Sequence, residues 1–270
     1  MFILFKKIKT LVILFLLTNA LFLSTSSAKA YERWFSPDYL LDSFVNIALK
    51  NEYSAYRGGV RKWVQPVRYY FEHHVADRDL HEALTTLHLR QLSEISGVKF
   101  HRVHKRQHAN LLIVFSTEKR LESGLQHEFG IRSTARNNQL FRNSVCLAYF
   151  STNARGSINK AFVMIPVDRA RAHAKLVSCI VEELTQIMGL PNDSEKVFPS
   201  IFNDKSYNQL LTGLDYLLLK MLYHPQVKAG MKEGSLRTVL KRVINEFERD
   251  GIIVRAQERA SDSGLYRLLN

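Results

Sequence analysis

Runs of apolar residues with two different spacings alternate along the chain, and their order limits the folds that it can adopt. Runs rich in β-branched and aromatic residues predict strands at 67–71, 98–103, 111–115, 145–150 and 161–165. Helical spacing of apolar residues predicts helices at 36–53, 80–96, 117–128, 169–188, 206–223 and 234–249, and Asp77 is expected to cap the second. This order of strands and helices is typical of an α+β fold.

The first thirty residues have the features of a signal peptide. Three lysines precede an apolar run from Leu11 to Leu23, no acidic side chain occurs, and a small-x-small triplet ends at Ala30. The run is shorter than the roughly 20 residues that span a bilayer. We therefore expect residues 1–30 to be removed, leaving a periplasmic or secreted chain that begins near Tyr31 and has no stable membrane span. An uncleaved anchor is the alternative.

The chain is basic, with a formal net charge of +13. Without the four lysines of the signal peptide, 34 basic and 25 acidic residues remain, and the charge is +9. The basic residues are scattered and accompany no recognition motif, so export and charge pattern argue against a nucleic-acid partner. The densest basic stretch, 101–108, is expected to be an exposed loop.

Two cysteines, Cys146 and Cys179, remain in the exported chain. An oxidising compartment favours a disulfide between them, which would tie a strand to the start of the helix at 169–188. Closing a loop of this length stabilises a fold by about 3–4 kcal/mol in the chain-entropy model. Two separately buried thiols are the alternative.

Both halves of the chain resemble matrixin-type metzincins. In the first half the resemblance rests on Trp63, the strand at 67–71, the long helix after it, and the segments 98–100 and 109–115. In the second half, 182–192 falls in the frame of the HExxHxxGxxH helix, and 214–215 with 222–223 resembles the closing helix. The resemblance implies a zincin-like mixed sheet packed on long helices, with extra N- and C-terminal helices.

A closer resemblance is to a proteobacterial family of secreted proteins and lipoproteins that contain a domain of unknown function. It rests on Glu-Glu-Leu-Thr-Gln at 182–186, Gly-Leu-Pro-Asn-Asp at 189–193, and the stretch 222–225 before Gly230-Met231. Together the resemblances cover most of 35–232. With the signal-peptide features and the predicted helices outside this range, the expected organisation is a signal peptide at 1–30, an N-terminal helical extension at 31–60, a zincin-like domain at 61–232 and a C-terminal helical extension at 233–270.

The frame of the zincin helix places Glu182, Gln186 and Asn192 where three zinc-binding histidines would stand. Side chains four apart on a helix project in similar directions, so 182 and 186 have the spacing of a ligand pair. One carboxylate and two amides are a poor zinc set. Glu183 takes the position of the general base, although a carboxylate without a metal-bound water has little to activate. We therefore predict that the chain has no metal cofactor. Glu182, Gln186, Asn192 and Asp193 are predicted to form a binding site.

Two further interpretations of this helix remain open. Glu182, Glu183 and Asp193 would together suit calcium or another hard divalent metal at a non-standard site. Alternatively, Glu182, Glu183 and Gln186 form a hydrogen-bonded polar cluster beneath a cleft, with Gly189 turning the chain.

No other group of residues predicts a chemistry. The histidines form no convincing set of metal ligands, whether paired or alone: His73, His74, His81, His88, His104, His108, His127, His173 and His224. His104 and His108 are expected at the surface. The sequence has no Gly-rich phosphate loop, Gly-x-Ser-x-Gly elbow or Cys/His dyad, which argues against nucleotide chemistry and the common nucleophilic hydrolases.

Two functions follow from the candidate helix. The first is a pseudoenzyme with a non-catalytic binding or structural role in the cell envelope, whose partner is a peptide, glycan or protein. The second is a metal-dependent peptidase or envelope-polymer hydrolase with Glu183 as general base. The apolar face of the last predicted helix is expected to pack on the domain, with partner binding as its alternative: Leu236, Val239, Leu240, Val243, Ile244 and Phe247.

Overall fold

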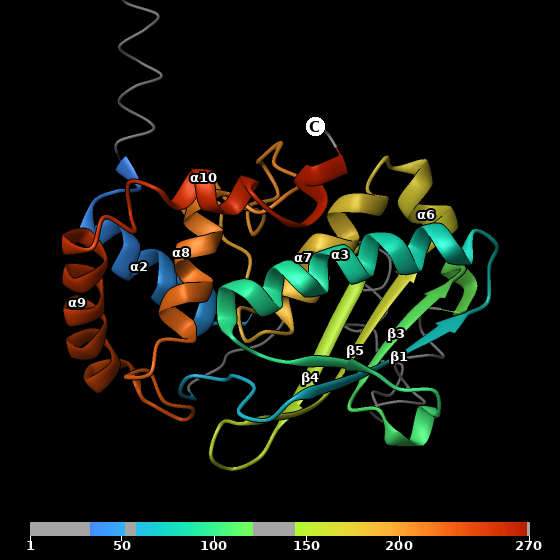
Figure 1. Cartoon of the computed structure of the whole chain (residues 1–270), viewed down its shortest axis with the longest axis horizontal. Helices are drawn as coiled ribbons and strands as arrows, with labels where there is room; N and C mark the ends of the chain where they lie inside the picture. Colours follow the sequence, from blue (N-terminus) through green and yellow to red (C-terminus); the bar gives the residue numbers. More distant parts are fainter. Residues whose placement is uncertain (1–32, 52–57, 121–143, 269–270) are drawn as a thin grey trace, which may run out of the picture.

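The computed structural model describes residues 33–51, 58–120 and 144–268 (Figure 1). The predicted signal peptide lies outside these residues, as does most of the helix predicted at 117–128, of which a 3-10 turn at Glu118–Arg120 is described. Among the described helices, none is both long and apolar enough to cross a membrane.

A five-stranded mixed sheet forms the centre of an α+β fold, as predicted, and seven α-helices accompany it within the described residues (Figure 1). The strands are ordered β2 (Phe100–Arg102), β1 (Val67–His73), β3 (Leu111–Ser116), β5 (Ile158–Pro166) and β4 (Leu147–Thr152). The first four are parallel to one another, and β4 is antiparallel to β5.

The central strand β3 is buried on both faces, which explains its uninterrupted apolar run at 111–115. Alternate side chains of a strand point to opposite faces. Leu111, Ile113 and Phe115 therefore join the main core, and Leu112 and Val114 join a second, smaller cluster on the other face. A strand of this type is recognisable from sequence because five consecutive residues, 111–115, are apolar on both faces.

Helix α3 (Arg78–Ser96) lies along the sheet beside α7 (Leu176–Gln186), and α7 packs on β4 and β5 (Figure 1). Helix α3 ends at Gly97, whose positive φ of 75° places it in the left-handed region expected of a glycine after a helix. Asp77 occupies the N-cap position but makes no capping bond. Its carboxylate instead pairs with Arg171 at 2.7 Å.

Three predicted helices have different bounds. Helix α2 (Pro37–Ala48) stops short of residue 53, because the Arg61 guanidinium takes the carbonyls of Ala48 and Lys50 at 3.1 and 2.7 Å. The helix predicted at 169–188 is two helices, α6 (Val167–Ala172) and α7, separated by a break at Ala174 with φ of 53°. The helix predicted from 206 begins at Gly213, after Thr212 forms a capping box with Asp215.

The C-terminal helices complete the main core. Helix α9 (Glu233–Arg249) packs on α2 and on α8 (Gly213–Leu222), and α10 (Ala256–Ser261) packs on α8 (Figure 1). The six apolar residues of the predicted stripe on α9 are all buried. Packing on the rest of the chain therefore accounts for this face. One cluster of buried side chains extends from Trp34 to Leu265 and includes the helices at both ends.

Candidate functional site

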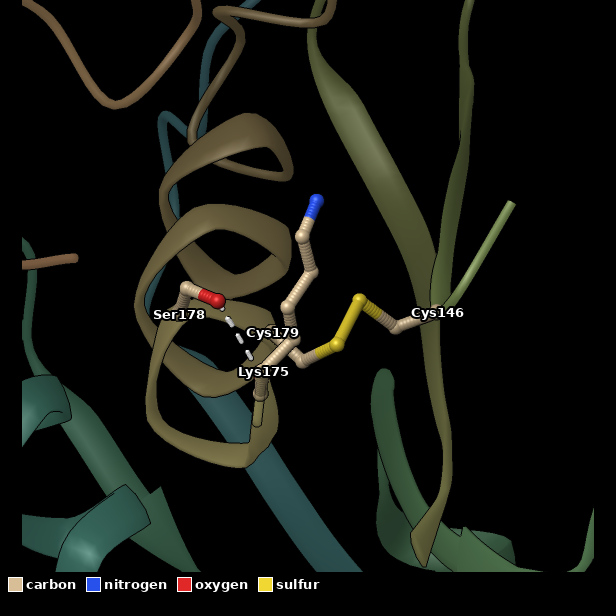
Figure 2. Close-up of a disulfide and its surroundings, with 4 residues drawn as sticks. All are labelled: Cys146, Lys175, Ser178 and Cys179. Carbon is tan, nitrogen blue, oxygen red and sulfur yellow. Dashed lines mark hydrogen bonds between the residues drawn. A yellow bond between two sulfur atoms is a disulfide. The ribbon is translucent and has the colours of Figure 1, made fainter. Parts of the chain in front are cut away.

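The candidate site is built on α7, whose first half is tied to the sheet by a disulfide. Cys179 bonds to Cys146, which immediately precedes β4, across a sequence separation of 33 residues (Figure 2). This confirms the predicted bridge. Near the same end, the Ser178 hydroxyl donates to the carbonyl of Lys175 at 3.1 Å (Figure 2). The covalent link fixes the start of the helix over β4 and β5.

The other end of α7 is held by the segment before β1 and by the end of α8. Carbonyls at a helix C-terminus lack partners within the helix. The indole Nε1 of Trp63 donates to the carbonyl of Ile187 at 2.9 Å, and the Tyr223 hydroxyl donates to that of Met188 at 2.8 Å. Gly189 then turns the chain with φ of 112°, so close to Arg61 that a Cβ would lie 1.9 Å from its carbonyl oxygen. This turn therefore requires glycine.

Beneath α7, a buried histidine joins it to α3. His88 Nε2 lies 3.0 Å from the hydroxyl oxygen of Thr185, and its Nδ1 lies 3.3 Å from Oε1 of Gln91. Gln91 is fixed in turn by donating to the carbonyls of Ala260 and Ser263. Burial lowers the pKa of His88 to about 4, so the ring is neutral at physiological pH. Its role here is to connect α3, α7 and the C-terminal segment.

The predicted ligand positions are mostly occupied in contacts within the chain. Glu183, Gln186 and Asn192 are buried, whereas Glu182 and Asp193 are half-buried. The amide nitrogen of Gln186 donates to Asp193 Oδ1 at 3.2 Å. That of Asn192 donates to the carbonyls of Asn46 and Asp193, each at 2.9 Å. These bonds hold the loop after α7 against the carboxyl end of α2.

Three carboxylates gather beside α7 and form what we call the acidic cluster: Glu182, Asp193 and Asp204. One oxygen from each lies within 4.8 Å of the others. Oxygen sets of this kind suit hard divalent cations such as calcium. Glu183, which the sequence interpretation grouped with Glu182 and Asp193, is not part of this set. Asp204 was missed because it lies in an irregular loop, where no periodicity predicts which way a side chain points.

The remaining histidines lie apart from α7's polar residues. His73 and His81 are stacked with Phe115, and His73 Nε2 lies 3.3 Å from Glu82. His224 lies 3.4 Å from Glu246 of α9. His101, His104 and His108 are exposed, as expected for the basic stretch 101–108, although 101–102 belong to β2 and Arg106–His108 forms a 3-10 helix rather than a loop. His127 lies outside the described residues. Within the described residues, no three histidines, cysteines or carboxylates other than the acidic cluster come together as a metal-ligating group.

Comparison with known proteins places the chain in a family without an assigned activity. The chain belongs to the family described as "Protein of unknown function (DUF2927)", whose model matches residues 37–242. The matched segment begins with α2 and extends into α9, so it contains the whole sheet, α7 and the acidic cluster. No curated protein matches the chain.

Proposed function

We propose that the chain is an exported protein with a zincin-like domain that has a non-catalytic binding or structural role in the cell envelope. Its partner would be an envelope peptide, glycan or protein. Export is supported by the signal-peptide features of residues 1–30 and by the disulfide, because disulfides persist in oxidising compartments. The zincin-like assignment is supported by the mixed sheet and by the packing of α7 on β4 and β5.

The non-catalytic proposal rests on the hydrogen bonds that the side-chain amides of Gln186 and Asn192 make within the chain. Asn192 gives its amide hydrogens to the carbonyls of Asn46 and Asp193, and Gln186 donates to Asp193. Neutral amides are weak zinc ligands, and these two already stabilise the loop that follows α7. Glu183 is 5% exposed, which leaves its carboxylate little access to a substrate water.

Elemental analysis tests this proposal on the purified mature protein after dialysis. We expect no stoichiometric transition metal and no cleavage of a broad peptide library. Glu183→Gln is compared with Glu195→Gln, which changes an exposed glutamate paired with Lys205. Cleavage that Glu183→Gln abolishes and Glu195→Gln preserves would overturn the proposal, as would one retained zinc ion per chain.

The second candidate is a metal-dependent peptidase or envelope-polymer hydrolase with Glu183 as general base. The acidic cluster is the observation in its favour, because carboxylate oxygens gathered within 4.8 Å of one another are the ligands that hard divalent cations prefer. Calcium titration followed by thermal unfolding separates the two functions. A calcium-dependent gain in stability that Asp204→Asn removes, together with calcium-dependent cleavage, would favour the hydrolase.

Export has its own test. The chain is expressed with its first thirty residues, and the N-terminus of the protein in the periplasmic fraction is sequenced. We expect the sequence to begin at Tyr31, after the small-x-small triplet. A membrane-bound chain that still carries Lys29 would identify an uncleaved anchor instead.

A further inference from the structure

A cavity of about 550 Å³ lies between three segments that are distant in sequence. One is the segment 62–66 that leads into β1, the second is the end of α3 with the residues after it, at 96–99, and the third is the loop that follows α8, at 223–229. The cavity shares no residue with the acidic cluster. It is within the size range of sites that bind small molecules. Residues 223–225, part of the stretch by which the sequence resembles its family, line one side.

The charged side chains that line this cavity are three lysines, Lys62, Lys99 and Lys228, and its described lining includes no aspartate or glutamate. We call it the three-lysine pocket. Lys99 and Lys228 are exposed, whereas Lys62 is 8% exposed. Concave sites lined by charges of one sign concentrate ions of the opposite sign. The lining therefore favours an anion.

Lys62 is held in a fixed position in the wall. Its Nζ donates to the carbonyls of Leu222 and Val227 at 2.7 and 3.0 Å and lies 4.8 Å from the centre of the Tyr223 ring. An ammonium group has three hydrogens to donate. Carbonyls among the described residues accept two of them, and no carboxylate among these residues neutralises the ammonium charge within the pocket lining.

The electrostatics of the lysines are those of a site that lacks a counter-charge. Burial, and to a smaller extent the positive charge of Lys228, together lower the pKa of Lys62 to about 8. An anion between these ammonium groups would offset both effects. By linkage, binding of an anion would raise the pKa of Lys62.

The pocket also has apolar walls. Val64 is 59% exposed although it is a large apolar side chain, and Pro66, Pro225 and Ala229 line the same cavity. We infer that the three-lysine pocket binds a small organic anion, with its carboxylate or phosphate group at Lys62, Lys99 and Lys228 and its apolar part against Val64. This site goes beyond the proposed function, since it involves neither α7's polar residues nor a metal.

Isothermal titration and NMR of the mature chain, at constant ionic strength, test this inference with five probes. Inorganic phosphate and acetate carry the charge alone, hexyl phosphate and hexanoate add an apolar chain, and hexanol carries the chain alone. We expect the two hexyl anions to bind at millimolar concentration or below and hexanol to bind not at all. The stronger of the two anions identifies the headgroup. No binding by either would overturn the inference.

Charge-removing variants locate the site. Lys99→Gln and Lys228→Gln are each expected to weaken hexyl-anion binding by about fivefold, and Val64→Ser to reduce the advantage of the hexyl anions over phosphate and acetate. Lys119→Gln removes an exposed lysine that follows the C-terminal end of β3 and does not line the pocket, so this variant should leave binding unchanged. If all three lysine variants weakened binding equally, the loss would come from the lower net charge of the chain and not from the pocket. That result would refute the site. Lys62→Met is a secondary test because Lys62 also supports the end of α8.

Discussion

The hydroxyl of Tyr223 donates a hydrogen bond of 2.8 Å to the carbonyl of Met188. It also accepts one of 3.2 Å from the backbone nitrogen of Trp63. One phenol thus connects the end of α8, the end of α7 and the segment leading into β1. Burial raises the pKa of Tyr223 well above its usual range, so it remains a neutral donor.

Removal of this hydroxyl should destabilise the fold. Tyr223→Phe leaves the Met188 carbonyl and the Trp63 amide without this partner, which is expected to cost about 1–3 kcal/mol. The free energy of unfolding in urea measures the loss. Tyr207→Phe removes a hydroxyl from a fully exposed tyrosine and should change nothing. Equal stabilities for the two variants would show that the bonds of Tyr223 contribute little.

The turn after α7 predicts a large difference between two glycine substitutions. In Gly189→Ala the new Cβ would meet the Arg61 carbonyl at 1.9 Å with φ at 112°, and a loss above about 4 kcal/mol or failure to fold is expected. Gly97 also has a positive φ, of 75°, but no atom lies within 4 Å of its Cβ position. Gly97→Ala should therefore cost only about 1–2 kcal/mol, from backbone strain alone. Thermal unfolding of both variants measures the contrast.

Periodicity and composition correctly predicted the strands and helices whose structure depends mainly on their own residues. Residues 111–115 of β3 are all apolar, α3 keeps helical spacing up to Gly97, and α9 has one apolar face, so local sequence was sufficient. The end of α2 was misplaced because Arg61, distant in sequence, binds the carbonyl of Ala48, the last residue of the helix, and that of Lys50 beyond it. Asp204 joins the acidic cluster through an irregular loop, and tertiary contacts of this kind leave no periodic pattern in a sequence.

The break between α6 and α7 was missed for a specific reason. The amides of Ala174 and Lys175 donate to the carbonyls of Arg171 and Ala170, the bonds of a Schellman motif, with Ala174 in its left-handed position. Glycine usually stands there and signals the end of a helix, whereas alanine is a strong helix former. The sequence at 169–188 therefore predicts one continuous helix.

This explanation predicts a stabilising substitution. Ala174→Gly relieves an alanine held at φ of 53° and is expected to raise stability by about 1 kcal/mol. Ala172→Gly, two residues earlier and within α6, should instead lower it by about 1 kcal/mol. Urea unfolding of both variants measures the pair. A loss of stability in Ala174→Gly would contradict the strained conformation.

The disulfide should contribute strongly to stability. Its sequence separation of 33 residues corresponds to about 4 kcal/mol in the chain-entropy model. The double variant Cys146→Ser with Cys179→Ser is compared with the oxidised protein in urea, with and without a reducing agent. Reduction should destabilise the native protein and leave the double variant unchanged. Complete labelling of both thiols in the untreated native protein would remove the prediction.

The buried His88 predicts how stability depends on pH. Its pKa is about 4 in the folded chain against 6.5 when exposed, because burial disfavours the charged ring. Below pH 6.5 the unfolded chain therefore takes up a proton that the folded chain refuses until about pH 4. The stability that depends on a neutral His88 is fully present above pH 6.5 and is lost as the pH falls to about 4. Over this range the free energy of unfolding should decrease by about 3 kcal/mol.

His88→Gln isolates this contribution, because other groups titrate in the same range. Burial raises the pKa of Asp215 to about 6, so its carboxyl stabilises the fold increasingly as the pH falls from there, with the opposite sign. That term is common to both proteins and cancels in their difference. We expect the stability of His88→Gln to decline less between pH 6.5 and 4 than that of the native chain, and that of His104→Gln, at an exposed site, to follow the native curve. Parallel curves for all three would mean that His88 takes up its proton equally in both states, and that burial between α3 and α7 does not keep it neutral.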